Sequence, residues 1–99
     1  MLLRERDTQQ GLLVSVCDTD CLGETYENGQ ATLEVTETFY GGDDAVEVGR
    51  EEVVSGLTRA QIANIVGDQA VEIAVDAGLV DEETVLEFDE TRHAQLLWL

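Results

Sequence analysis

The sequence predicts an α+β fold formed by a single domain that spans residues 1–99. Three observations lead to this prediction: strand-like patterns fill the first half of the chain, helix-like patterns follow, and strand-like patterns return at the end. Strands and helices that are grouped, without a regular βαβ alternation, are typical of the α+β class. We therefore expect a mostly antiparallel sheet, made from N-terminal hairpins and C-terminal strands, that packs against one or two helices.

The first predicted strand covers residues 11–17. Its apolar side chains fall on both faces, so we expect it at the centre of the sheet. The dipeptide Asn28-Gly29 is a strong signal for a two-residue hairpin turn, because both central residues of such a turn need positive φ. Pairing of the flanking segments around that turn places Tyr26 opposite Ala31.

The middle of the chain is predicted to be helical. Residues 51–57 form a short helical candidate, and Thr58 begins a capping-box pattern. Apolar side chains then recur at helical spacing through 62–77, as one helix or as two that divide at Gly67. Gly78 lies where a left-handed C-cap is favoured.

Short strands are expected on both sides of the helical region, at 46–48, 84–88 and 94–99. The last of them ends in the apolar run Leu96-Leu97-Trp98-Leu99. An apolar terminus is more stable when it packs into the sheet or against a second copy of the chain. The apolar C-terminus is therefore a candidate homodimer contact.

The charge balance indicates the environment of the protein. Twenty-two acidic residues face only five basic ones, all arginine, which gives a formal net charge of −17. Such a surface repels itself unless salt screens it. Acids that are dispersed along a lysine-free chain predict a halophilic protein; the alternative is an acidic mimic of nucleic acid, which needs the acids gathered on one face.

Composition also excludes classes of function. Five scattered arginines cannot form a basic patch, so we expect no direct binding to DNA. No apolar run reaches the 18 or so residues that cross a bilayer, and the charged N-terminus is no secretory signal. We therefore expect a cytoplasmic protein without a membrane partner.

A catalytic site can be drawn from a few residues. Cys17 would act as nucleophile, His93 as base, and Asn64 or Asp18 would orient the imidazole. The same cysteine could instead ligate zinc together with Cys21, His93 and one acid, although the spacing is atypical. In the third interpretation both cysteines are buried, reduced and structural. We assign no metal and no cofactor.

Two polar segments are candidates for a binding surface. The first contains Asn64 and Gly67, which either start a helix whose amides face an anion or simply mark a helix junction. The second contains Arg92, His93 and Gln95, just before the apolar end. The arginine either holds a carboxylate or phosphate, or pairs with one of the neighbouring acids.

Several short motifs, in the same order and over nearly the whole chain, make the sequence similar to the archaeal domain of unknown function 424 family. These motifs are Val14–Asp18, Leu22-Gly23, Phe39–Gly41, Ala63–Gly67, Ala70-Val71 and His93–Gln95. The resemblance implies a small α+β protein of the archaeal cytoplasm with a link to translation and no established activity. From the lysine-free acidity we expect a haloarchaeal member of that family. The characteristic polar and glycine positions carried over are Asp18, Gly23, Tyr40, Gly41, Asn64, Gly67, His93 and Gln95.

Two hypotheses for function follow. The first is a non-enzymatic binding protein that contacts a protein or ribonucleoprotein of the translation machinery. Its contact surface combines the segments around Asn64 and His93, and the resemblance adds Tyr40. The second is a small-molecule enzyme in which Cys17 and Asp18 join those segments in one pocket.

Overall fold

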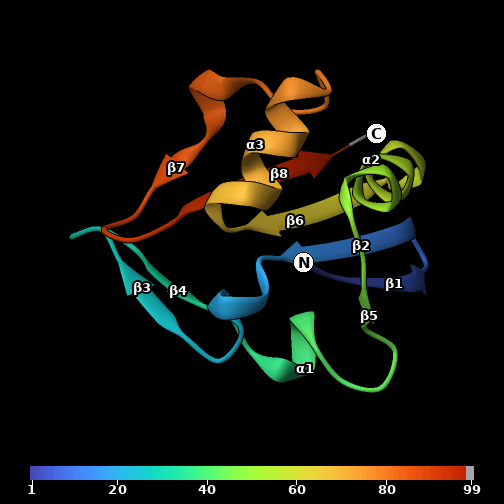
Figure 1. Cartoon of the computed structure of the whole chain (residues 1–99), viewed down its shortest axis with the longest axis horizontal. Coiled ribbons are helices and arrows are strands. Elements are labelled where there is room, and N and C mark those ends of the chain that lie inside the picture. The colour runs from blue at the N-terminus through green and yellow to red at the C-terminus, as the bar shows by residue number, and fades with distance from the viewer. Residues whose placement is uncertain (98–99) are drawn as a thin grey trace.

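A computed structural model gives the structure and describes residues 1–97. Its centre is a six-stranded sheet in the order β5-β1-β2-β6-β8-β7, which Figure 1 shows from the N-terminal strands in blue to the C-terminal strand in red. Every neighbouring pair is antiparallel except β2 and β6, so the predicted α+β class and mostly antiparallel sheet are confirmed. The strands are β1 (Leu2–Thr8), β2 (Gly11–Cys17), β5 (Val46–Glu47), β6 (Ile62–Val66), β7 (Leu86–Glu87) and β8 (Arg92–Leu97).

Two helices, α2 (Arg50–Arg59) and α3 (Asp68–Asp76), pack on one face of this sheet. Between them and the strands lies the larger core cluster, in which Leu57, Ile65 and Val71 are fully buried. A Schellman-type cap ends α3. The Leu79 amide donates to the Ala74 carbonyl, and Gly78, which directly precedes Leu79, has a positive φ of +73°. None of the helices among residues 1–97 has the length and apolar character needed to cross a bilayer.

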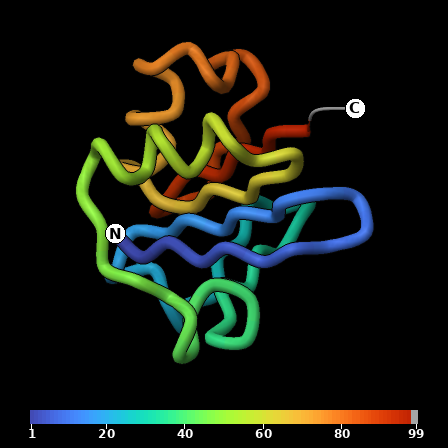
Figure 2. Tube along the Cα trace, turned by 90° about the vertical axis from the view of Figure 1, so that its right-hand side faces the viewer, coloured from blue at the N-terminus to red at the C-terminus, as the bar shows by residue number. Residues whose placement is uncertain are grey.

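A second, smaller layer covers part of the opposite face. It consists of the hairpin β3 (Thr25–Glu27) and β4 (Thr32–Glu34), the one-turn helix α1 (Glu37–Tyr40) and the 3-10 turn η1 (Thr19–Cys21). Figure 2 shows α2 on one side of the β1–β2 hairpin and the segment around α1 on the other. The tip of the β3–β4 hairpin meets the turn between β7 and β8, where the Asp89 amide donates to the Glu27 carbonyl (Figure 1).

The largest error of the sequence interpretation concerns residues 62–66, which form the central strand β6 and not a helix. The apolar pattern of residues 62–77, which has helical spacing, in fact covers two elements, a strand and the helix that follows it. Ala63 and Ile65 point to one face of the sheet and Val66 to the other, so burial on both faces outweighs the helical pattern. Gly67, at φ +113°, turns the chain between the two elements. The strand also creates a parallel β2-α2-β6 crossover, which contradicts the expected absence of a βαβ unit.

The register of the predicted hairpin is also wrong by two residues. Tyr26 pairs with Leu33, and not with Ala31. The Asn28 carboxamide oxygen accepts hydrogen bonds from the Gln30 and Ala31 amides at 3.0 and 2.8 Å. Asn28 therefore opens a four-residue turn instead of occupying its first central position.

Strand β1 was absent from the sequence interpretation because residues 4–7 are all charged. Arg4 and Arg6 project from the face opposite α2 and donate to backbone carbonyls of α1, the second at 2.9 Å to Phe39. The guanidinium of Arg6 also lies 4.7 Å from the centre of the Phe39 ring. Charged side chains thus attach α1 to the sheet, while Leu3 on the other face enters the core.

At the C-terminal end, the predicted strands at 84–88 and 94–99 correspond to β7 and β8, with shifted bounds. Of the apolar run, Leu96 is buried in the core and Leu97 is 58% exposed. Trp98 and Leu99 lie outside the described residues. The homodimer contact therefore stays a prediction.

Candidate binding cleft

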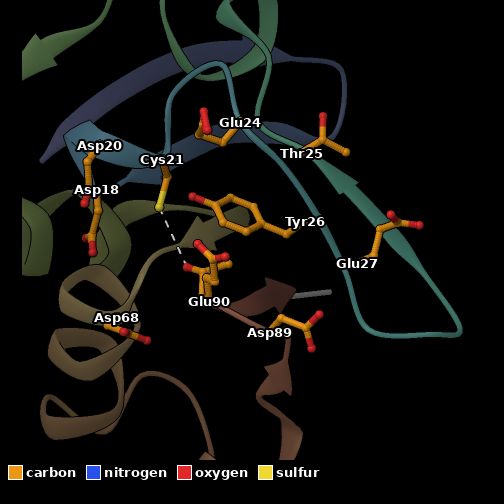
Figure 3. Close-up of a pocket in the computed structure, with 11 residues that line it drawn as sticks. Asp18, Asp20, Cys21, Glu24, Thr25, Tyr26, Glu27, Asp68, Asp89 and Glu90 are labelled. Atoms are coloured by element: carbon orange, nitrogen blue, oxygen red, sulfur yellow. Dashed lines mark hydrogen bonds between the residues drawn. The ribbon is translucent and has the colours of Figure 1, made fainter.

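A cleft of about 480 Å³ opens where four segments of the chain converge: the β2–η1 turn, strand β3, the start of α3 and the turn before β8. Figure 3 shows the ring of Tyr26 extending into the middle of this cleft, with its hydroxyl directed toward Cys21. Carboxylate side chains dominate the lining. They belong to Asp18, Asp20, Glu24, Glu27, Asp68, Asp89 and Glu90.

The parallel pairing of β2 with β6 forms the base of the cleft. Since Cys17 is in register with Val66, the next residues, Asp18 and Gly67, leave the sheet at the same edge. A Cβ atom at position 67 would lie 2.3 Å from the Asp18 carboxyl carbon, so glycine permits this approach. The carboxylate then reaches the first turn of α3.

Asp18 caps that helix from outside its own segment. Its two carboxylate oxygens accept hydrogen bonds from the Gln69 and Ala70 amides at 3.0 and 2.9 Å. The side chain is only 8% exposed, and it places a negative charge at the positive end of the helix dipole. The amides that the sequence interpretation left open to an anion are therefore occupied by Asp18.

The wall opposite α3 is built around Cys21, which is 4% exposed. Its sulfur lies 3.7 Å from the Thr91 hydroxyl, the contact drawn as a dashed line in Figure 3. Burial raises the pKa of the Cys21 thiol, and hydrogen bonds to Tyr26 and Thr91 oppose that effect in part. Burial likewise raises the pKa of Tyr26, so both groups stay neutral near pH 7.

The electrostatic character of the cleft follows from these contacts. Arg92 binds the Asp68 carboxylate and the Glu72 carboxylate, each at 3.2 Å, and so neutralises part of the charge near α3. The remaining acids face a hollow with protein walls, which concentrates their field. The arrangement attracts cations and repels phosphates and carboxylates. It is chemically suited to an ammonium or guanidinium group.

One part of the cleft has ligand atoms close enough for a metal ion. Oxygens of Asp18 and Asp20 and the sulfur of Cys21 all lie within 4.8 Å of one another. The zinc ligands considered from the sequence, Cys17 with Cys21 and His93, are not grouped in this way among the described residues. Cys17 and His93 are in register with opposite edges of β6, with the Val66 side chain between them.

That separation also bears on the predicted catalytic group. Strands two apart in a sheet are roughly 10 Å from each other, which is beyond hydrogen-bond reach for the Cys17 thiol and the His93 imidazole. Cys17 is fully buried, and burial, followed by its neighbours Cys21 and Asp18, raises the pKa of its thiol to about 12. Burial lowers the pKa of His93. Cys17 and His93 thus pair with the same residue of β6 from opposite edges, but the structure does not bring them together as a nucleophile and its base.

The residues predicted to bind a partner lie in three different places. Asn64 and Gln95 are directly opposite each other on β6 and β8, on the face away from α2 and α3, and His93 lies on the same face. Gly67 and Arg92 instead lie beside the acidic cleft. Tyr40, only 4% exposed, packs inside the smaller core cluster.

Comparison with known proteins adds the family. The sequence profile of the family described as "Protein of unknown function (DUF424)" matches residues 5–99. The chain belongs to this family. The fold is similar to that in the crystal structure of an uncharacterized conserved protein from Methanopyrus kandleri, with a TM-score of 0.73 and 26% sequence identity over 99% of this chain and 92% of that one. No curated protein matches the chain.

The sequence interpretation of this DUF424 family member missed most residues of the cleft. Asp89 and Glu90 were considered only as acids that could pair with Arg92, and Glu24 was not singled out, because acids are too frequent here for any one of them to stand out. It also missed Ser15, which lies in register with Asn64 and is fully buried, with no hydrogen-bond partner for its hydroxyl among the described residues. The available signal was the strand pattern of 11–17, which places Ser15 on the same face as Cys17.

Proposed function

We propose that the protein is a non-enzymatic binding protein whose acidic cleft receives a lysine or arginine side chain of a protein partner. The observation that carries this proposal is the cleft itself, a hollow of about 480 Å³ lined by seven carboxylates. Concave sites with a few converging polar groups are the usual places where proteins bind ligands. A guanidinium or ammonium group matches both the charge and the hydrogen-bond acceptors of this lining.

The chemistry of the cleft supports binding in preference to catalysis. Its thiol, that of Cys21, has a raised pKa, so it is a poor nucleophile near neutral pH. The Asp18 carboxylate is already engaged by two amides of α3. The enzyme alternative built on Cys17 and His93 lacks a contact between the two side chains, as described above.

The partner class follows from the same charge argument. Proteins that contact nucleic acid carry lysine- and arginine-rich segments, and components of the translation machinery are the class that the family resemblance implies. In this proposal the protein contacts such a component through its basic side chains, and not through RNA phosphates. Electrostatic attraction would guide the encounter, and the shape of the cleft would select the side chain.

The test is an affinity pull-down from native cell extract at multimolar KCl, analysed by mass spectrometry. A cleft variant carries Asp20→Asn, Glu24→Gln and Glu27→Gln. The matched control variant removes the same number of charges outside the cleft, through Asp43→Asn, Glu82→Gln and Glu83→Gln. We expect ribosomal proteins or translation factors with the wild type and the control, and their loss with the cleft variant.

Other outcomes overturn the proposal. Equal retention by the cleft variant and its control would mean that the cleft is not the contact surface, and equal loss would mean that net charge alone attracts the partner. A further variant, Asn64→Ala with Gln95→Ala, tests the surface that the sequence indicated on the open face of the sheet. Loss of partners with that variant alone would transfer the function to that face.

A further inference from the structure

A second hollow lies on the other side of the molecule, between α2 and the outer edge of the sheet. It encloses about 880 Å³ and is lined by residues of β1, of α2 and of the segment 44–48, which contains β5. Leu3, Val46 and Val48 form its apolar part, and Val46 is 58% exposed, a large fraction for an apolar side chain of the described residues. We call this hollow the α2 groove. It shares no residue with the acidic cleft.

The shortness of β5 leaves the sheet incomplete beside the α2 groove. β5 pairs only with Leu2 and Leu3, whereas β1 continues to Thr8. Along Arg4–Thr8 the outer edge of β1 therefore has no strand partner among the described residues. Unpaired strand edges carry free amide and carbonyl groups, and an extended segment of another chain can pair with them.

The rim of the groove is acidic. Asp44, Glu51 and Glu52 surround the apolar floor, and Asp44 is 73% exposed on its side chain. Arg59, the basic residue of the lining, is held by Glu5 at 2.6 Å. A partner segment with basic residues on both sides of an apolar one would complement this pattern of charge.

We infer that the α2 groove docks an extended segment of a partner protein, in which an apolar side chain packs on Val46 and Leu3 between flanking lysine or arginine residues. The segment would continue the line of β5 along the free edge of β1. Alternation of side chains along a strand then directs every second residue into the groove. This inference does not depend on the function proposed for the cleft.

The test uses a fluorescein-labelled peptide in which lysine alternates with valine, titrated by fluorescence anisotropy at the lowest KCl concentration that keeps unfolding cooperative. The control peptide has the same composition with all lysines at one end. The test variant is Val46→Asp, and the matched variant is Leu86→Asp, whose side chain is similarly exposed, at 51%, but lies outside the groove. Neither change removes a core residue, so both variants should fold.

We expect the alternating peptide to bind the wild type and the Leu86→Asp variant equally. Val46→Asp should weaken binding by about 10-fold or more, because the groove loses its apolar contact. Equal binding to Val46→Asp, or equal binding of the two peptides, would overturn the inference. So would a change of oligomeric state in Val46→Asp seen by sedimentation, since a second copy would then occupy the groove. The cleft variant should bind this peptide normally, which separates a failure here from a failure of the proposed function.

Discussion

Removal of the Asp18 carboxylate tests the main structural argument, that this residue joins the end of β2 to the start of α3. In Asp18→Ala the Gln69 and Ala70 amides lose their acceptor at a site with little access to water. A hydrogen bond to a charged group contributes about 1.5–3 kcal/mol net, and the helix dipole adds about 0.3–1 kcal/mol. The two bonds share one carboxylate and are not independent, so we expect a loss of about 3 kcal/mol.

Urea unfolding at a fixed high salt concentration, followed by circular dichroism, measures this loss. For a domain of this size about 3 kcal/mol corresponds to a fall of roughly 15 °C in Tm. Asp18→Asn, which keeps one oxygen acceptor, should lose about half as much. The control is Asp81→Ala, which removes the exposed cap of the Glu83 amide and should cost about 0.5 kcal/mol. A loss below about 0.5 kcal/mol for Asp18→Ala would refute the capping argument.

The contact with Gly67 gives the experiment a second arm. Gly67→Ala places a Cβ against the carboxylate and also imposes φ +113° on an L-residue, at a cost of about 1–3 kcal/mol for the backbone alone. It also displaces Asp18 from α3, so the lost cap is counted in both single variants. The double variant Asp18→Ala with Gly67→Ala should therefore lose about 2 kcal/mol less than the two single losses added together. Strict additivity would show that the two residues do not act on each other.

Four further experiments test charge and burial. In folded protein at pH 8, iodoacetamide should leave Cys17 unmodified, because burial raises the pKa of its thiol to about 12, and modification should become fast only in urea; rapid labelling of the folded state would contradict this. Burial lowers the pKa of His93 below its unfolded value, so protonation of this imidazole does not reduce the free energy of unfolding above pH 6.5 and reduces it as the pH drops below 6.5. In a pH series of urea titrations, His93→Gln should remove that decrease. A halophilic fold should lose cooperative thermal unfolding below about 0.5 M KCl, and a full transition in dilute buffer would contradict the prediction. At low salt the cleft variant should unfold at a higher temperature than its matched control, because like charges that share a hollow repel more strongly than dispersed ones.

The parts of the fold that sequence patterns predicted are those in which local and tertiary preferences agree. The strand at 11–17, the helix of 68–77 and the C-cap at Gly78 each carry a periodicity or a backbone requirement that only one structure satisfies. The segment 62–66 is different, since its apolar spacing fits a helix as well as a buried strand. Its state is decided by β2 and β8, which cover both of its edges and are distant in sequence.

The turn at Asn28 shows how one hydrogen bond changes a prediction. Asparagine before glycine favours a tight two-residue turn, but the same side chain also accepts bonds from the amides that follow it. The second effect determines the register here. Strand β1 shows the opposite case. Its charged residues led to no strand prediction, because charged side chains are expected to face water, whereas its arginines bind α1 carbonyls.

The candidate cleft depends on topology more than on composition. In a chain with 22 acids, no single carboxylate marks a site, and the seven that line the cleft come from segments far apart in sequence. What brings them together is the parallel pairing of β2 with β6, which places Asp18 against Gly67 and sets the position of α3. Once 62–66 is recognised as a strand, that adjacency follows from register alone, because neighbouring parallel strands end at the same edge of a sheet. The misassigned strand and the missed cleft therefore have a single cause, and the Asp18 and Gly67 variants probe the link between them.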